Sequence, residues 1–268
     1  MELKELGKTG VKLPEIGLGA WQYKGGVEPL RKGISLGASL VDTAESYDTE
    51  GIVGEAIKGR RERVFIATKV SGAHLRHDDL LRAAENSLER LGTHYIDLYQ
   101  IHWPNSRIPI TETMQAMEAL VDMGKVRFIG VSNFSVAELQ EAQAAMSKYN
   151  IVSNQVLYNL LDREIEDSLL PYCEQSNITV IAYTPLARGG LSSKSLFRRR
   201  HEMDILQKIA SEAGKSMAQV ALNWCISKPN VIAIPKANRI EHVIENCAAS
   251  GWRLSAEQME ALNAAFHR

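Results

Sequence analysis

The chain has 268 residues and a formal net charge of −1, from 31 lysines and arginines against 32 aspartates and glutamates, and 45% of its residues are hydrophobic. This length favours a single domain, residues 1–268, whose core is large enough to need no disulfide or metal. The near-neutral charge argues against nucleic acid as a partner, because phosphate-binding surfaces usually carry a basic excess.

Cysteine usage and the lack of long apolar segments indicate the compartment. Cys173, Cys225 and Cys247 are far apart and odd in number, so we expect small core residues in a reducing compartment. The N-terminus lacks an apolar signal segment, and no run reaches the roughly 18 apolar residues of a membrane span. We therefore expect a cytoplasmic protein without a membrane span, and a monomer, since no large exposed apolar stripe is evident.

Short apolar strands alternate with helices along the whole chain. Two short runs, residues 3–6 and 11–13, flank a glycine-containing turn and predict an opening β-hairpin. Later strands are expected at residues 16–18, 40–41, 64–68, 96–101, 126–131, 152–155, 179–183 and 231–234. Helices are expected at about residues 28–37, 51–58, 78–91, 111–123, 136–149, 166–175, 203–213, 217–227 and 240–249, and after Ser255. Gly92 is the expected C-terminal cap of the helix at 78–91, and Ser255 is the expected N-cap of the last helix, with Gln258 three residues on.

These segments form eight strand–helix units, and the strands are apolar enough to be covered on both faces. We predict an α/β fold, a closed (β/α)8 TIM barrel with an N-terminal β-hairpin and extra helices near the C-terminus. The alternative is an open, doubly wound sheet. Such a sheet usually carries a Gly-x-Gly-x-x-Gly loop after its first strand, and Gln22 stands where the third glycine would follow Gly17 and Gly19.

Four residues able to take part in proton chemistry follow three of the predicted strands. They are Asp42 and Tyr47 after the strand at 40, Lys69 after the strand at 64, and His102 after the strand at 96. Each alone has a structural explanation, such as a turn cap, a half-buried rim residue, a surface lysine or a structural histidine. Because the C-terminal ends of parallel strands share one rim, their joint placement favours an enzyme.

Three sequence blocks carry a resemblance to a known family: Asp42 to Tyr47 (DTAESY), Ile101 to Pro104 (IHWP) and Ile129 to Phe134 (IGVSNF). In this order at barrel-strand ends, they resemble the aldo-keto reductases. The resemblance extends from Gly17 to Lys236. It implies reduction of aldehydes and ketones to alcohols by hydride transfer from NAD(P)H.

The same resemblance implies a catalytic tetrad of Asp42, Tyr47, Lys69 and His102. Tyr47 would be the general acid at the carbonyl oxygen, and the pKa of a free phenol, near 10, is too high for this task at neutral pH. Lys69, held by Asp42, would lower that pKa. His102 would orient the carbonyl oxygen.

The cofactor-binding positions are also implied by the resemblance. Ser132, Asn133 and Gln155 would bind the nicotinamide carboxamide, although Asn133 could instead cap the helix near residue 136. Tyr183 would lie against the nicotinamide ring, and Thr184 and Leu186 in the phosphate region, followed by Arg188, which stands where the family often has a small polar residue. Lys236 and Arg239 would contact the 2'-phosphate, and Glu245 and Asn246 the adenine.

Two departures from the family pattern affect the choice of cofactor. Ala237 replaces a common serine, and His242 replaces the usual arginine, for which Arg239 could substitute. We expect NADPH to be preferred, with NADH possible. The basic run at residues 198–201 could reach the pyrophosphate, but a solvated loop face is the favoured interpretation.

Trp21 and Trp103 match substrate-pocket positions of the family and would form an apolar wall beside the tetrad. The chain ends soon after the last predicted helix, so we expect an open pocket for a small-molecule carbonyl substrate. Small aldehydes and α-dicarbonyls such as methylglyoxal are the expected substrates. Two rivals are a nucleotide-binding regulatory subunit with slow or absent turnover and a metal-assisted barrel hydrolase. The hydrolase would need several metal ligands on the rim, where only His102 is evident, and we expect no metal.

Overall fold

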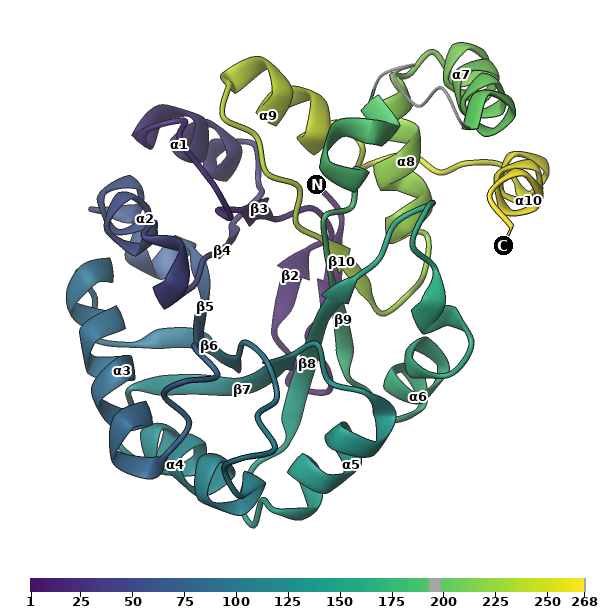
Figure 1. Cartoon of the computed structure of the whole chain (residues 1–268). Helices are drawn as coiled ribbons and strands as arrows, with labels where there is room; N and C mark the ends of the chain where they lie inside the picture. Colours follow the sequence, from purple (N-terminus) through teal and green to yellow (C-terminus); the bar gives the residue numbers. More distant parts are fainter. Residues whose placement is uncertain (193–198, 268) are drawn as a thin grey trace.

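The computed structural model describes residues 1–192 and 199–267 and contains a barrel of eight parallel strands surrounded by helices (Figure 1). Consecutive strands along the chain are neighbours in the sheet. The strands are β3 (Leu18–Gly19), β4 (Leu40–Asp42), β5 (Phe65–Val70), β6 (Ile96–Ile101), β7 (Val126–Ser132), β8 (Ile151–Leu157), β9 (Thr179–Tyr183) and β10 (Val231–Ala233). The predicted eight strand–helix units are confirmed.

The first and last strands meet and close the barrel. Ile16 forms a parallel bridge with Ala233, and the backbone N–H of Gly17 donates to the carbonyl of Ala233 at 2.8 Å. A side chain at Gly19 would bring its Cβ within 2.6 Å of the Ile234 carbonyl oxygen. The glycines of this segment therefore allow the close approach of β10, and the open-sheet alternative is wrong.

Helices form the outer ring of the barrel (Figure 1). They are α1 (Val27–Ser35), α2 (Glu50–Ile57), α3 (His77–Leu91), α4 (Ile110–Asp122), α5 (Val136–Ala144), α6 (Leu169–Gln175), α7 (Arg200–Ala213), α8 (Met217–Ile226), α9 (Ile240–Cys247) and α10 (Ala256–Ala265). The predicted caps are confirmed, since Gly92 ends α3 in the left-handed conformation and Ser255 forms a capping box with Gln258. Among the described residues, no helix is long and apolar enough to cross a membrane.

Helix α5 is five residues shorter than predicted. The carboxylate of Glu118 accepts hydrogen bonds from the backbone N–H groups of Ser147, Lys148 and Tyr149, at 2.9, 2.6 and 3.2 Å. These contacts hold residues 147–149 outside the helical path. The apolar periodicity of the segment does not reveal a carboxylate that reaches it from α4.

A two-stranded antiparallel hairpin, β1 (Leu3–Glu5) and β2 (Lys12–Pro14), crosses the far end of the barrel in Figure 1. Leu6 and Leu13 pack there with Leu40, Leu98 and Ile181 in a buried cluster inside the barrel. The hairpin therefore closes the N-terminal end of the barrel. The opposite end, at the C-terminal ends of the strands, carries the candidate site.

Candidate functional site

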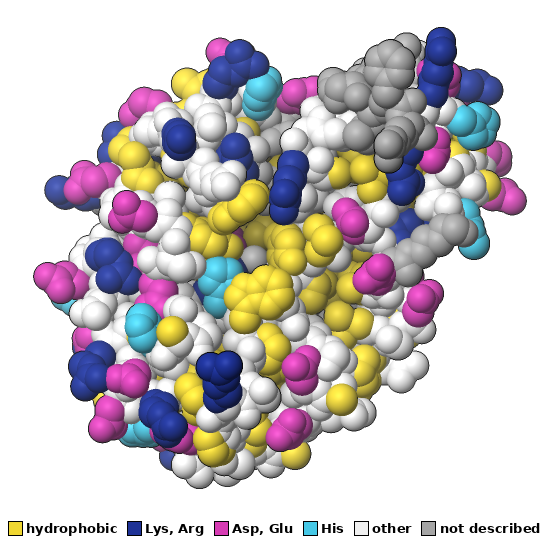
Figure 2. Space-filling model, in the orientation of Figure 1, with side chains coloured by type: hydrophobic (Ala, Val, Ile, Leu, Met, Phe, Trp, Pro, Cys, Tyr) yellow, Lys and Arg dark blue, Asp and Glu magenta, His cyan; other side chains and the backbone are white. Residues whose placement is uncertain are grey.

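A cavity of about 730 Å³ lies at the C-terminal ends of the barrel strands, and Figure 2 shows hydrophobic side chains gathered around this hollow. Its size is in the range of small-molecule sites. Most residues that the sequence predicted for the site line it: Trp21, Asp42, Tyr47, His102, Trp103, Ser132, Asn133, Gln155, Tyr183, Thr184, Leu186, Arg188, Lys236, Glu245 and Asn246. Two predicted residues, Lys69 and Arg239, are not part of the lining.

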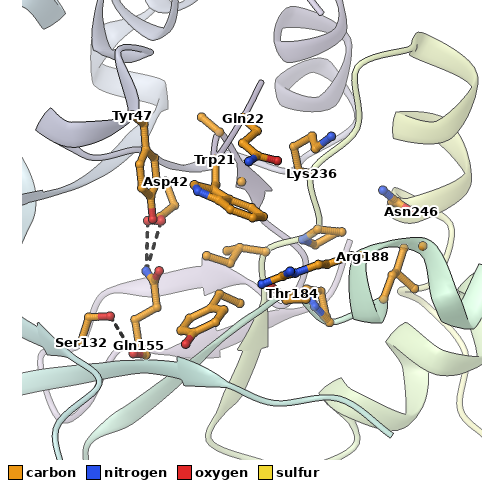
Figure 3. Close-up of a pocket in the computed structure, with 18 of the residues that line it drawn as sticks. Trp21, Gln22, Asp42, Tyr47, Ser132, Gln155, Thr184, Arg188, Lys236 and Asn246 are labelled. Carbon is orange, nitrogen blue, oxygen red and sulfur yellow. Dashed lines mark hydrogen bonds between the residues drawn. The ribbon is translucent and has the colours of Figure 1, made fainter. Parts of the chain in front are cut away.

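Lys69 lies behind the cavity wall in a buried ion pair with Asp42. Its Nζ donates to both carboxylate oxygens of Asp42 at 2.6 Å and to the carbonyl of Thr43 at 2.8 Å. Gln155 Nε2 donates to the same two carboxylate oxygens, at 3.1 and 3.0 Å (Figure 3). All three hydrogens of the ammonium are therefore in use. Burial raises the pKa of Asp42 and lowers the pKa of Lys69, while their mutual attraction acts in the opposite direction.

Tyr47 comes from a 3₁₀ turn, η1 (Glu45–Tyr47), directly after β4. The Lys69 Nζ lies 4.9 Å from the centre of the Tyr47 ring. Burial, followed by the nearby Asp42 carboxylate, raises the pKa of Tyr47 above its ordinary value of 10.0. The predicted lowering of this pKa by Lys69 is therefore wrong for this structure, because the ammonium is neutralised by Asp42 and donates elsewhere. The Tyr47 phenol is protonated at neutral pH.

His102 follows β6 and presents its imidazole to Tyr47. Its Nε2 lies 3.3 Å from the Tyr47 hydroxyl, and its Nδ1 lies 3.4 Å from Ser46 Oγ. The His102 carbonyl accepts a hydrogen bond from Asn133 Nδ2 at 3.1 Å. Burial, helped by the charge of Lys69, lowers the pKa of His102 to about 4. The imidazole is therefore neutral at physiological pH.

Sequence reasoning missed Ser46 because it weighed Asp42 and Tyr47 as the chemical residues of the Asp42 to Tyr47 block. The 3₁₀ turn brings the intervening serine against the same imidazole that Tyr47 meets. Gln22 also lines the cavity and was not predicted. No apolar periodicity marks either position, so only their place in loops after barrel strands could have indicated them.

A hydrogen-bonded polar group lies beside the tetrad, at the ends of β7, β8 and β9. Tyr183 donates from its hydroxyl to Asn133 Oδ1 at 2.9 Å, and Asn133 Nδ2 donates to Ser132 Oγ at 3.0 Å. Asn133 has a left-handed backbone, with φ of 63°. The alternative that Asn133 caps the next helix is wrong, because Ser135 is the N-cap of α5 and forms its capping box.

Two positively charged side chains, Arg188 and Lys236, also line the cavity. The Arg188 guanidinium lies 5.5 Å from the centre of the Trp21 ring, and Figure 3 shows the two side chains facing each other across the cavity. Within residues 1–192 and 199–267, neither Arg188 nor Lys236 forms an ion pair with a carboxylate. These two cations are therefore available to an anionic ligand.

Arg239 lies outside the cavity lining, whereas His242 is part of that lining. Arg239 Nη2 lies 2.6 Å from His242 Nε2. The basic run predicted as a loop face is only partly described: Arg198 lies outside the described residues, and Arg199, Arg200 and His201 are exposed and do not line the cavity.

Trp21 and Trp103 both line the cavity with partly exposed rings, 40% and 53% accessible. The Trp103 ring stacks near the His102 imidazole, with centroids 6.5 Å apart. The site thus combines a protonated phenol, a neutral imidazole, apolar aromatic surfaces and unpaired cations. Such a site can bind an anionic cofactor beside an apolar organic substrate and deliver a proton to an oxygen between them.

Comparisons with known proteins agree with this geometry. The chain is 41% identical over 266 residues to the methylglyoxal reductase YeaE of Escherichia coli, covering 96% of this chain and 92% of that protein. Its structure matches that of the thermostable aldo-keto reductase Tm1743, solved with the inhibitor epalrestat, with a TM-score of 0.92 and 45% identity, covering 99% of this chain and all of the other.

A second solved structure, an aldo-keto reductase from Klebsiella pneumoniae in complex with NADPH, matches with a TM-score of 0.90 and 41% identity, covering 99% of this chain and 96% of the other. The model of the aldo/keto reductase family matches residues 15–266, which include every strand of the barrel and every residue of the site. The closed barrel, the tetrad at its C-terminal end and these matches agree, and the chain belongs to the aldo/keto reductase family.

Proposed function

We propose that this protein reduces small aldehydes and α-dicarbonyls to alcohols with NADPH, and that Tyr47 is the general acid. The proposal rests on one observation. The protonated Tyr47 hydroxyl and the neutral His102 imidazole lie 3.3 Å apart in one cavity, next to the buried Asp42–Lys69 pair. Addition of hydride to a carbonyl leaves an alkoxide. A proton donor and a hydrogen-bonding partner at that oxygen are the groups this step requires.

Bound NADPH would supply the hydride. Its nicotinamide carboxamide would be held by Ser132, Asn133 and Gln155, with the Tyr183 ring against the nicotinamide. The other residues proposed to hold the cofactor are Thr184, Leu186, Arg188, Lys236, Arg239, Glu245 and Asn246. The fit is supported by the unpaired cations Arg188 and Lys236, which suit phosphate groups, and by the NADPH complex of the Klebsiella relative.

The chain's own residues would act in a simple order. Trp21 and Trp103 would pack against the organic part of the substrate and exclude water from the carbonyl. His102 would orient the carbonyl oxygen through a ring N–H, and Tyr47 would give its hydroxyl proton to that oxygen as the negative charge develops. The buried Asp42–Lys69 pair would hold the Tyr47 ring in position, with the ammonium 4.9 Å from the ring centre.

The substrate class is supported by the two exposed tryptophans of the pocket and by the methylglyoxal reductase of Escherichia coli, which covers nearly the whole chain. A planar, uncharged α-dicarbonyl can lie between indole rings without leaving a charge unpaired. We propose methylglyoxal and small aromatic aldehydes as substrates, with NADPH preferred over NADH.

The test follows the loss of reduced-nicotinamide absorbance with methylglyoxal and a panel of aromatic aldehydes, run separately with NADPH and NADH. Turnover with NADPH and much slower turnover with NADH is the expected result. Equal rates with both cofactors would keep the reaction and overturn the cofactor preference. Tight NADPH binding without turnover of any carbonyl would overturn the reductase proposal and favour the nucleotide-binding regulatory role.

A further inference from the structure

Two consecutive residues of one short turn contact the two ring nitrogens of His102. Ser46 Oγ lies 3.4 Å from Nδ1, and the Tyr47 hydroxyl lies 3.3 Å from Nε2. Both residues belong to η1, so a single 3₁₀ turn supplies a hydrogen-bonding hydroxyl to each nitrogen of the imidazole. Within the described residues, Ser46 has no other hydrogen-bonding partner through its side chain.

The turn itself is anchored from its first residue. Glu45 Oε1 accepts hydrogen bonds from the backbone N–H of Ser71 and, at 3.0 Å, pairs with His74 Nδ1. The Glu45 side chain is only 10% exposed. These contacts tie η1 to the loop after β5, so Ser46 is held in place on a supported element.

A neutral imidazole carries one hydrogen, so only one of its two nitrogens can donate. If the hydrogen is on Nδ1, it points to Ser46, and Nε2 must accept from the Tyr47 hydroxyl. The phenol proton is then engaged by His102. If the hydrogen is on Nε2, the Ser46 hydroxyl must donate to Nδ1. His102 can then donate an N–H into the cavity, and the Tyr47 proton remains free for a substrate oxygen.

We propose that Ser46 is a positioning residue whose hydroxyl donates to His102 Nδ1 and so holds the imidazole in its Nε2–H tautomer. This inference rests on the proposed function, because proton donation by Tyr47 requires its hydroxyl hydrogen to be free. Ser46 acts through His102 and transfers no proton itself. Its effect is on which nitrogen of His102 is protonated, a property that can be measured without any turnover.

The experiment records ¹⁵N resonances of the histidine rings at neutral pH in the full-length protein. The chain has seven histidines, and His102→Gln assigns the His102 pair by its disappearance. We expect an unprotonated Nδ1 and a protonated Nε2 in the natural protein and in Ser46→Thr, which keeps a hydroxyl. In Ser46→Ala the two tautomers should mix, and kcat should fall by about three- to tenfold, the effect of one hydrogen bond.

Three controls separate positioning from general damage. Ser35→Ala removes a different exposed hydroxyl, on α1, and should change neither tautomer nor turnover. The thermal midpoint and the NADPH dissociation constant of Ser46→Ala should match the natural protein, because Ser46 is exposed and makes no other side-chain bond.

A protonated Nδ1 in the natural protein would overturn the inference, as would an unchanged tautomer in Ser46→Ala. Absence of carbonyl reduction would instead overturn the proposed function, since the ring resonances still report the tautomer. The failures of the two proposals are therefore distinguishable.

Discussion

Gln155 donates from its side-chain amide to both carboxylate oxygens of Asp42, at 3.1 and 3.0 Å, although 113 positions separate the two residues in the chain. The bond crosses the barrel from β8 to β4 (Figure 3). Together with Lys69, it gives the buried carboxylate four hydrogen-bonding contacts. Gln155 therefore supports the tetrad directly, in addition to its proposed contact with the cofactor.

Replacement of Gln155 by leucine should lower the free energy of unfolding by about 1–3 kcal/mol, because the buried Asp42 carboxylate loses the amide donor that contacts both of its oxygens. Urea denaturation at pH 7 measures this change. Gln115→Leu, at an exposed position of α4, is the matched control and should have little effect. Unchanged stability of Gln155→Leu together with weaker NADPH binding would show that the glutamine serves only the cofactor.

Tyr47→Phe should reduce kcat for methylglyoxal reduction by roughly 100- to 10,000-fold, the usual contribution of a positioned general acid. NADPH binding, followed by quenching of tryptophan fluorescence, should remain within about twofold, since the phenyl ring keeps its packing. Tyr149→Phe loses only a surface hydrogen bond to Asp122 and is the control for removal of a phenol. Near-normal turnover of Tyr47→Phe would exclude Tyr47 as the proton donor.

The lowered pKa of His102, about 4, gives a pH dependence of stability with a definite sign. In the unfolded chain His102 binds a proton near its ordinary pKa of 6.5, whereas in the folded protein it resists protonation down to about pH 4. Stabilisation is therefore present above pH 6.5 and is lost as the pH falls through about 4. The free energy of unfolding, measured by urea denaturation between pH 7 and 4, should fall less steeply in His102→Gln.

The same pKa predicts that kcat/KM for carbonyl reduction shows no ionisation near pH 6.5. A histidine-like transition at that pH, absent in His102→Gln, would contradict the neutral imidazole. Parallel stability curves for the natural protein and His102→Gln would contradict it independently.

Arg239→Ala should weaken NADPH binding by about tenfold and NADH binding much less, if Arg239 contacts the 2'-phosphate. The Arg239 side chain contacts His242, which lines the cavity. Fluorescence titration with each cofactor measures the two dissociation constants. Equal weakening of both cofactors would show that Arg239 does not distinguish them.

Lys236→Met offers a comparison within the same cavity, because Lys236 has no carboxylate partner among the described residues. It should weaken NADPH binding more than NADH binding. The NADPH dissociation constant of the variant should also change less with salt concentration than that of the natural protein. A loss confined to NADH would contradict its assignment to the phosphate end.

The sequence by itself predicted the barrel and the placement of Asp42, Tyr47, Lys69 and His102 at the C-terminal ends of its strands. Apolar runs of strand length and helix-period segments alternate along the chain, and each tetrad residue stands at the end of such a run, where local pattern is informative. The helix caps at Gly92 and Ser255 could also be predicted from local sequence, because one depends on the conformation of a single glycine and the other on a single hydroxyl.

The tertiary structure alone decided what depends on distant partners. Glu118 shortens α5 from a neighbouring helix, and Gln155 reaches Asp42 across the barrel. The pKa of Tyr47 is raised by burial and then by the neighbouring Asp42 carboxylate, and Ser46 meets His102 only when η1 and the end of β6 are brought together. Hydrogen bonding and desolvation depend on the three-dimensional surroundings of each group, which local sequence pattern does not contain.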